Sequence, residues 1–206
     1  MIRLYSLLAT GFVAAMLGGL GYFVYSGQQQ TGFNQCRATS VAGGAGSIGG
    51  PFELVDHTGR TVTDADFADR PVLLYFGYTF CPDVCPLDTA RNAQAVDLLA
   101  ERGLEVTPVF ISVDHQRDTI EALAEFVRFM HPEMIGLTGS EEQIRNAARA
   151  YRMYFAIQDT DDDFYLIDHS TFSYLLLPGH GFVEVIRRDQ SPEQVADTVA
   201  CFINNA

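Results

Sequence analysis

The 206-residue sequence contains no lysine and no C-x-x-C pair. Zinc ribbons and general thiol–disulfide oxidoreductases use C-x-x-C motifs, so the absence of this motif disfavours both classes. The four cysteines are too few to staple a domain of this length, which can bury a full core without them. The formal net charge of −13 repels phosphate backbones, so no nucleic acid is expected as a partner.

Residues 1–25 are predicted to form a transmembrane anchor. Residues 4–25 contain no charged side chain and no histidine, and a helix of this length spans ~33 Å, enough to cross the hydrocarbon core. The apolar run is longer than that of a cleaved signal peptide and ends in the bulky Phe23 and Tyr25, so we expect an uncleaved anchor. Only Arg3 is basic before the span, which places the N-terminus in the cytoplasm and the rest outside.

Residues 26–50 are predicted to be a flexible linker. This stretch is polar, contains a glycine-rich run at 43–46, and has no apolar period that would indicate a helix or strand. Such a tether would let the following domain, residues 51–206, reach a partner in the same membrane.

Residues 51–206 predict one α/β domain. Alternating residues at 52–56 and a return at 61–63 predict an N-terminal β-hairpin. Continuous apolar runs at 71–76 and 106–113 predict strands buried on both faces. This order of elements, βαβα followed by ββα, describes a thioredoxin-like fold with an N-terminal β-hairpin extension. The predicted helices are 87–102, 120–130, 140–151 and 191–204, and the late hairpin is 173–186.

The loop after the first buried strand carries Cys81 and Cys85. Residues four apart lie on one side of a helical turn with Cα atoms ~6 Å apart, so both sulfurs can reach one metal ion or form a disulfide. Two prolines accompany them. Pro82 suits a first helical position, whereas Pro86 is expected to make the turn irregular. Cysteines flanked by proline at a strand end are poorly placed to be inert core residues.

A third candidate ligand, His169, lies far downstream between Asp168 and Ser170. A lone histidine is often only a hydrogen-bonded surface residue. Two thiolates with one imidazole suit Cu(I) and can also hold Cu(II), whereas structural zinc prefers four ligands. We therefore expect one copper ion per chain, held by Cys81, Cys85 and His169. The other histidines are not expected to be ligands: His57, His115, His131 and His180.

These residues lie in motifs that closely resemble those of the SCO/SenC family. Residues 75–86, YFGYTFCPDVCP, are similar to the family's copper motif. The resemblance covers roughly residues 51–203, and its C-x-x-x-C with a distant D-H-S is specific. The other similar segments follow in the family's order: Phe110–Asp114, Arg117–Thr119, His131–Pro132, Ile135–Gly139 and Asp168–Ser170.

The resemblance implies a thioredoxin-like fold, a single N-terminal anchor, and Cys81, Cys85 and His169 as copper ligands. Similar proteins deliver copper to the dinuclear copper site of cytochrome c oxidase, or reduce the cysteines there. It thus implies a copper chaperone of the bacterial inner membrane with its soluble domain in the periplasm. Its partner would be cytochrome c oxidase subunit II or an assembly factor. One departure is His115, where the family usually has proline; this histidine could alter the loop or add a metal contact, and its role stays open.

Other functions stay open at this point. Cys81 lies near a helix N-terminus, which should lower its pKa and favour thiol–disulfide exchange. A redox or copper sensor that signals through a partner is not excluded by the sequence. A peroxidase would need an arginine beside one reactive cysteine, and Arg91 is the only downstream candidate on the first helix.

The two remaining cysteines lie outside the family's motifs. Cys36 falls in the predicted linker and Cys201 in the last helix. The predicted compartment is oxidising, which permits a disulfide between them. However, a flexible tether does not fix the ~5.5 Å Cα separation that a bridge needs. We therefore expect a buried Cys201 and a free Cys36.

Overall fold

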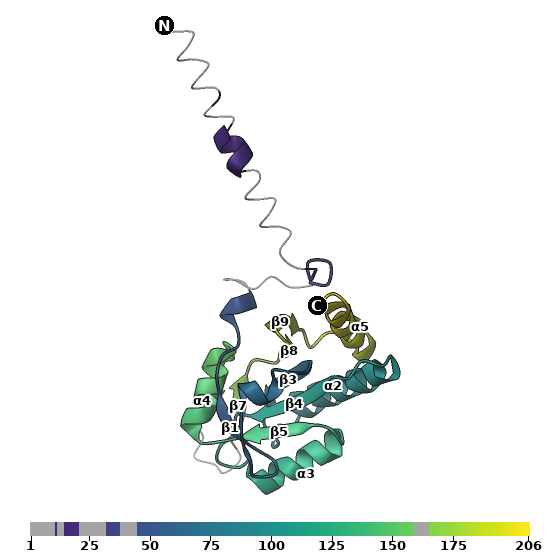
Figure 1. The fold of residues 1–206 in the computed structure, drawn as a ribbon. Coiled ribbons are helices and arrows are strands. Elements are labelled where there is room, and N and C mark those ends of the chain that lie inside the picture. Colours follow the sequence, from purple (N-terminus) through teal and green to yellow (C-terminus); the bar gives the residue numbers. More distant parts are fainter. Residues whose placement is uncertain (1–10, 12–14, 21–31, 38–44, 159–164) are drawn as a thin grey trace. The chain divides into compact units, whose positions relative to one another are not determined.

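The folded domain occupies most of the chain. Of two compact units, residues 1–35 with Asn205 form one, and residues 36–204 with Ala206 form the domain (Figure 1). Most of the predicted anchor lies outside the described residues, so it stays a prediction. Within the part of the chain that is described, no helix is both long and apolar enough to cross a membrane. The computed structural model describes residues 11, 15–20, 32–37, 45–158 and 165–206.

A seven-stranded mixed sheet forms the centre of the domain (Figure 1). Its strands are β1 (Glu53–Asp56), β2 (Thr61–Thr63), β3 (Val72–Gly77), β4 (Thr107–Ser112), β5 (Ile135–Thr138), β8 (Ser173–Leu177) and β9 (Gly181–Ile186). The order is β2-β1-β5-β4-β3-β8-β9. Strands β3, β4 and β5 are parallel, whereas β8 and β9 continue the sheet in antiparallel pairing. The predicted N-terminal hairpin, β1–β2, joins the other edge by pairing antiparallel with β5.

Helices cover both faces of the sheet, which is why every residue of β3 is buried. The helices are α2 (Val84–Glu101), α3 (Ile120–Met130), α4 (Glu141–Ala150) and α5 (Pro192–Asn204). On one face, the Tyr75 hydroxyl donates to Asp88 of α2 at 3.1 Å. On the other, the Phe76 ring lies 5.6 Å from the ring of Tyr151, at the end of α4. Because successive strand side chains point to opposite faces, α2 and α4 lie on opposite sides of β3.

Helix α2 begins at Val84, three residues before the predicted start. Pro86 therefore falls in the first turn, where a backbone N–H has no acceptor within the helix, so its ring removes no hydrogen bond. The expectation that Pro86 makes this turn irregular is wrong for that reason. The end of the helix agrees with the sequence, since Gly103 adopts the left-handed conformation, φ 74°.

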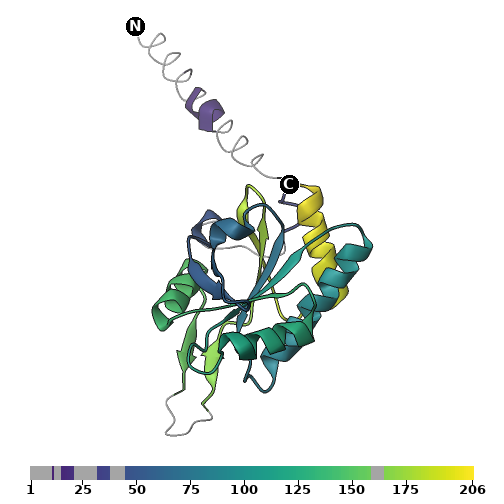
Figure 2. The ribbon, with the colours of Figure 1, turned by 60° about the horizontal axis from the view of Figure 1, so that its bottom comes forward.

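A small antiparallel pair of strands was not predicted from the sequence. It consists of β6 (Phe155–Ile157) and β7 (Ile167–His169), which pair only with each other and form a separate sheet. Phe155 lies opposite His169 in the register. Figure 2 shows the two strands extending together from one end of the domain. Each strand has only three residues, too few for the period of a strand to be recognised.

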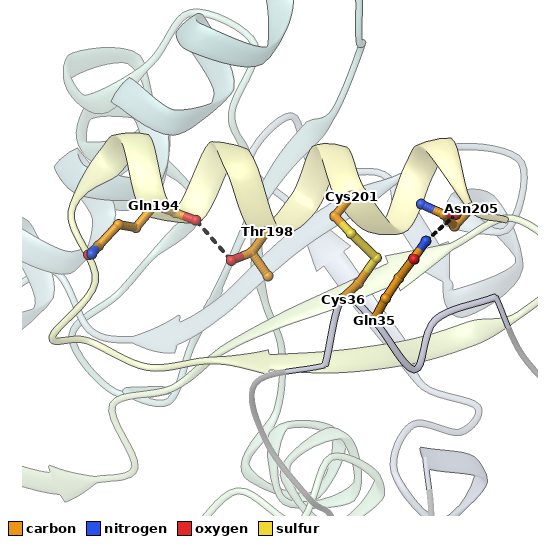
Figure 3. The surroundings of a disulfide bond; sticks show 6 residues. All are labelled: Gln35, Cys36, Gln194, Thr198, Cys201 and Asn205. Carbon is orange, nitrogen blue, oxygen red and sulfur yellow. Dashed lines mark hydrogen bonds between the residues drawn. A yellow bond between two sulfur atoms is a disulfide. The ribbon is translucent and has the colours of Figure 1, made fainter. Parts of the chain in front are cut away.

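The N-terminal end of the domain is fixed in two places within the predicted linker. A disulfide joins Cys36 to Cys201 of α5, with Cα atoms 5.6 Å apart (Figure 3). The helix η1 (Ala45–Ser47) contacts β9, and Gly49 N–H donates to Ala150 O at 2.8 Å. The expectation of a free Cys36 and a buried Cys201 is therefore wrong, because the two are bridged and Cys201 is only partly buried. Residues 45–50 are folded onto the domain, which the polar composition of the predicted linker does not reveal.

We predict that replacing Cys36 or Cys201 with serine lowers the stability of the domain. The bridge closes a loop spanning 165 residues, and a cross-link over a long loop typically contributes about 2–4 kcal/mol by restricting the unfolded chain. Denaturant unfolding should show this loss in either variant, and in the wild type after reduction. Intact-mass analysis of the unreduced, alkylated protein should find Cys36 and Cys201 unmodified; two further alkylated thiols would contradict the bridge.

Candidate metal centre

Cys81 and Cys85 lie where the buried strand β3 passes into helix α2. The N–H of Cys81 donates to the carbonyl of Tyr78 at 3.3 Å and closes a turn. The N–H of Cys85 then donates to the Cys81 sulfur at 3.4 Å. The Cys81 sulfur thus accepts from one of the N–H groups that an α-helix leaves free at its N-terminus. The positive end of the helix dipole favours a thiolate at this position.

Gly77 makes room for the second sulfur at the end of β3. A Cβ on Gly77 would lie 3.2 Å from the Cys85 sulfur and 3.0 Å from ring atoms of Tyr75 and Phe110. A side chain here would displace one of these groups, which have little freedom in the core. Cys85 is consequently fully buried, while Cys81 keeps 8% of its surface exposed.

His169 reaches the same place from strand β7. Its Nε2 lies 3.2 Å from the Cys85 sulfur, and its Nδ1 lies 2.9 Å from the carbonyl oxygen of Ser170. A carbonyl only accepts hydrogen bonds, so Nδ1 carries a proton and Nε2 is the nitrogen that a neutral ring offers to a metal. The rings of Tyr75 and Tyr78 both meet the imidazole edge-to-face, with centroids 6.2 and 5.9 Å away.

The three side chains singled out in the sequence therefore come together. The ligand atoms of Cys81, Cys85 and His169 all lie within 4.8 Å of one another. Both cysteines are free thiols. His115 is not part of this group: its Nε2 lies 3.9 Å from a carboxylate oxygen of Glu141.

The arginine expected for a peroxidase is held elsewhere. Arg91 on α2 donates to the hydroxyl of Ser173 at 3.1 Å and to the carbonyl of Arg187 at 3.1 Å. Its guanidinium also donates to the Asn92 side chain and lies 3.8 Å from the carboxylate of Asp88. With these contacts Arg91 links α2 to strand β8 and to the segment after β9, which is a structural role.

The pKa values of the two thiols are shifted in opposite directions. A hydrogen bond from the Cys85 thiol holds the pKa of Cys81 well below its ordinary value, against the opposing effect of burial. The same bond to Cys81, together with burial, raises the pKa of Cys85. One sulfur is therefore ready to bind a soft cation at neutral pH, whereas the other must give up a proton as the metal enters.

Asp118 fixes the first half of the cysteine loop, a role that the sequence did not reveal. Its carboxylate is 2% exposed and accepts from the Thr79 N–H at 2.9 Å, the Thr79 hydroxyl at 2.6 Å and the Ser112 hydroxyl at 2.5 Å. Burial raises the pKa of this carboxyl. In the sequence, Asp118 belongs only to a segment that resembles the family. The type and position of this residue do not predict its hydrogen bonds to Thr79, which lies 39 residues earlier in the chain.

The chain is similar in sequence and in fold to known proteins of one family. The SCO1/SenC family model matches residues 41–204. Protein SenC of Rhodobacter capsulatus is 50% identical over 199 residues, which are 97% of this chain and 90% of that protein. The crystal structure of Arabidopsis thaliana ScoI with copper bound has a TM-score of 0.73 at 41% identity, covering 76% of this chain and 98% of the other.

The crystal structure of yeast Sco1 with copper bound has the same TM-score of 0.73, at 32% identity over 78% of this chain and 90% of the other. These matches confirm the mixed α/β, thioredoxin-like architecture predicted from the sequence. Both neighbours hold copper, and in this chain the two sulfurs and one imidazole can form a copper site. The matches over nearly the whole chain and the order of its motifs lead to one conclusion: the protein belongs to the SCO1/SenC family.

Proposed function

We propose that this protein is a membrane-anchored copper chaperone that binds one copper ion through Cys81, Cys85 and His169. The proposal is supported above all by the geometry of the site, in which two sulfurs and one imidazole nitrogen from segments 84 residues apart lie within 4.8 Å of one another. Copper in the Arabidopsis and yeast relatives supports the identity of the ion. Sulfur ligands with one imidazole select Cu(I) and also tolerate Cu(II).

The exposure of the ligands suits an ion that is handed on. Cys85 is fully buried, Cys81 is 8% exposed and His169 is half-buried, so an acceptor can approach from the side of Cys81 and His169. Three ligands leave room for a fourth from the acceptor during exchange. Copper is then cargo, and each new bond to the acceptor replaces one to this protein.

The recipient that fits is cytochrome c oxidase subunit II, at its dinuclear copper site, or an assembly factor of that site. The proposal places the chain in the bacterial inner membrane through residues 1–25, with the domain in the periplasm. The net charge of −13 favours an acceptor with a basic surface, because complementary charge speeds encounter.

A thiol–disulfide reductase is the second candidate. The lowered pKa of Cys81 and the adjacent free thiol of Cys85 favour it. In this reaction Cys81 and Cys85 would form a disulfide as an acceptor's disulfide gains two electrons and two protons. Copper transfer leaves both thiols of this protein free, so counting thiols after reaction with the oxidised subunit II copper domain separates the two functions. A copper sensor would do neither and would instead bind a signalling partner.

We predict tight binding of one Cu(I) per chain, lost in Cys81→Ala and Cys85→Ala and weakened in His169→Ala, in which two thiolates still hold the ion. The affinity should fall as pH falls, because ligand atoms must be deprotonated to bind a metal and the raised pKa of Cys85 makes its proton hard to remove. An anaerobic competition titration with a Cu(I) chelator at several pH values measures this. His180→Ala is the matched control and should retain wild-type affinity. Binding that is independent of pH, or equal in all variants, would contradict the ligand set.

We predict a periplasmic location for the domain. A reporter fused after Ala206 should be active only if it works in the periplasm, because Arg3 precedes an apolar segment that is followed by an uncharged stretch. Membrane fractions should contain the full-length chain, and deletion of residues 1–25 should release it. Activity of a reporter that works only in the cytoplasm would reverse the orientation.

A further inference from the structure

The strand that carries His169 is not part of the central sheet. Strands β6 and β7 pair only with each other, so no ladder of backbone hydrogen bonds from the seven-stranded sheet holds β7. By contrast, the two cysteines lie on the junction of β3 with α2, inside the core. Side-chain contacts must therefore hold the histidine against the sulfurs. Tyr75 and Tyr78 meet its ring directly, and several further contacts between the two segments involve Arg117.

Arg117 binds the segment that leads into β7. Its Nη1 donates to the carbonyl of Tyr165 at 2.9 Å, and its guanidinium lies 3.5 Å from the centre of the Tyr165 ring. The Tyr165 hydroxyl donates to Asp114 at 2.6 Å. Burial, followed by this hydrogen bond, raises the pKa of Tyr165 to about 12, so the hydroxyl keeps its proton at neutral pH.

The same guanidinium also faces the cysteine loop. It lies 5.1 Å from the ring of Phe80 and 5.8 Å from the ring of Tyr78, within the range of cation–π attraction. Phe80 directly precedes Cys81, and the Tyr78 hydroxyl accepts a hydrogen bond from the N–H of Ile167 on β7 at 3.3 Å. Arg117 therefore touches both of the segments whose ligands must meet.

An ion pair fixes Arg117 itself. Its Nε donates to Asp114 at 2.5 Å, where the arginine side chain is 16% exposed and the aspartate is fully buried. The planar fork of the guanidinium lets Nε bind Asp114 while Nη1 binds Tyr165 and the face stacks on a ring. A lysine has one point charge and cannot make these three contacts together.

We propose that Arg117 is a positioning residue that holds His169 against the two cysteine sulfurs and thereby sets how long copper is retained. This inference rests on the proposed function, in which His169 is a copper ligand. Without Arg117, the small hairpin β6–β7 keeps its own pairing but loses its attachment near Tyr165. The histidine then leaves the sulfurs more often, and copper held by two thiolates alone is released sooner.

The test is a double-mutant cycle on the full-length protein. Arg117→Gln is made in the wild type and in His169→Ala, and the release of Cu(I) to an excess of bathocuproine disulfonate is timed. Arg117→Gln should speed release about tenfold to 100-fold in the wild type, the range typical for partners that orient a metal ligand. In His169→Ala it should have no further effect. Equal acceleration in both backgrounds would overturn the proposal, since Arg117 would then act on the fold or on the cysteines.

A measurement on the metal-free protein keeps the proposal testable if copper does not bind as proposed. In Arg117→Gln, amide exchange should quicken at Ile167, which bonds the Tyr78 hydroxyl across to the cysteine loop. It should stay slow at Ser170, whose N–H donates to Tyr154 within the hairpin region. Unchanged amide exchange at Ile167 in Arg117→Gln would refute the positioning role of Arg117. Failure of the wild-type protein to bind copper is a different result, and it would refute the proposed function.

Arg145→Gln is the matched control. Arg145 also lies over an aromatic ring of the hairpin, 5.1 Å from the centre of Phe155. It is 46% exposed, however, and its side chain pairs with Glu141 on its own helix. This variant should release copper at the wild-type rate, while Arg117→Lys should behave almost like Arg117→Gln. Acceleration by Arg145→Gln equal to that by Arg117→Gln would show that any arginine stacked on a ring of this hairpin has the same effect, which contradicts a specific role.

Discussion

The site depends on the 3.2 Å approach of His169 Nε2 to the Cys85 sulfur. This contact joins strand β7 to the junction of β3 with α2, and no strand pairing connects these two segments. Neighbouring residues position the sulfur on one side and the imidazole on the other. Gly77 leaves space for the sulfur, and the Ser170 carbonyl turns the imidazole so that Nε2 faces it. Without this approach, the domain would present two thiols at a helix N-terminus, a geometry suited to disulfide exchange rather than to holding a metal.

The ligands differ in how firmly the fold holds them. Cys85 lies in a helix packed on a fully buried strand, so its sulfur has almost no freedom. His169 lies on a three-residue strand of a separate pair. In the proposed copper chaperone, firmly held sulfurs would favour tight capture, and a less firmly held imidazole would favour release to an acceptor. A Cys81–Cys85 disulfide would use both sulfurs, so metal binding and oxidation exclude each other.

The sequence predicted most of the sheet and helices, because buried strands such as β3 and amphipathic helices such as α3 have clear periods. The pair β6–β7 was missed because its strands are too short to show a period. The disulfide of Cys36 was expected not to form, because composition shows that a segment is polar but not that its far end is folded onto the domain. The roles of Asp118 and Arg117 depend on tertiary contacts, which local patterns do not encode.

The proposed site holds one copper ion through two sulfurs and one imidazole nitrogen. X-ray absorption spectroscopy of the protein loaded with one equivalent of Cu(I) measures this ligand set directly. We predict a first shell of two sulfur scatterers and one nitrogen, with the outer-shell pattern of an imidazole that disappears in His169→Ala. A shell of only nitrogen and oxygen, or a shell that is identical in the wild type and in His169→Ala, would contradict the account.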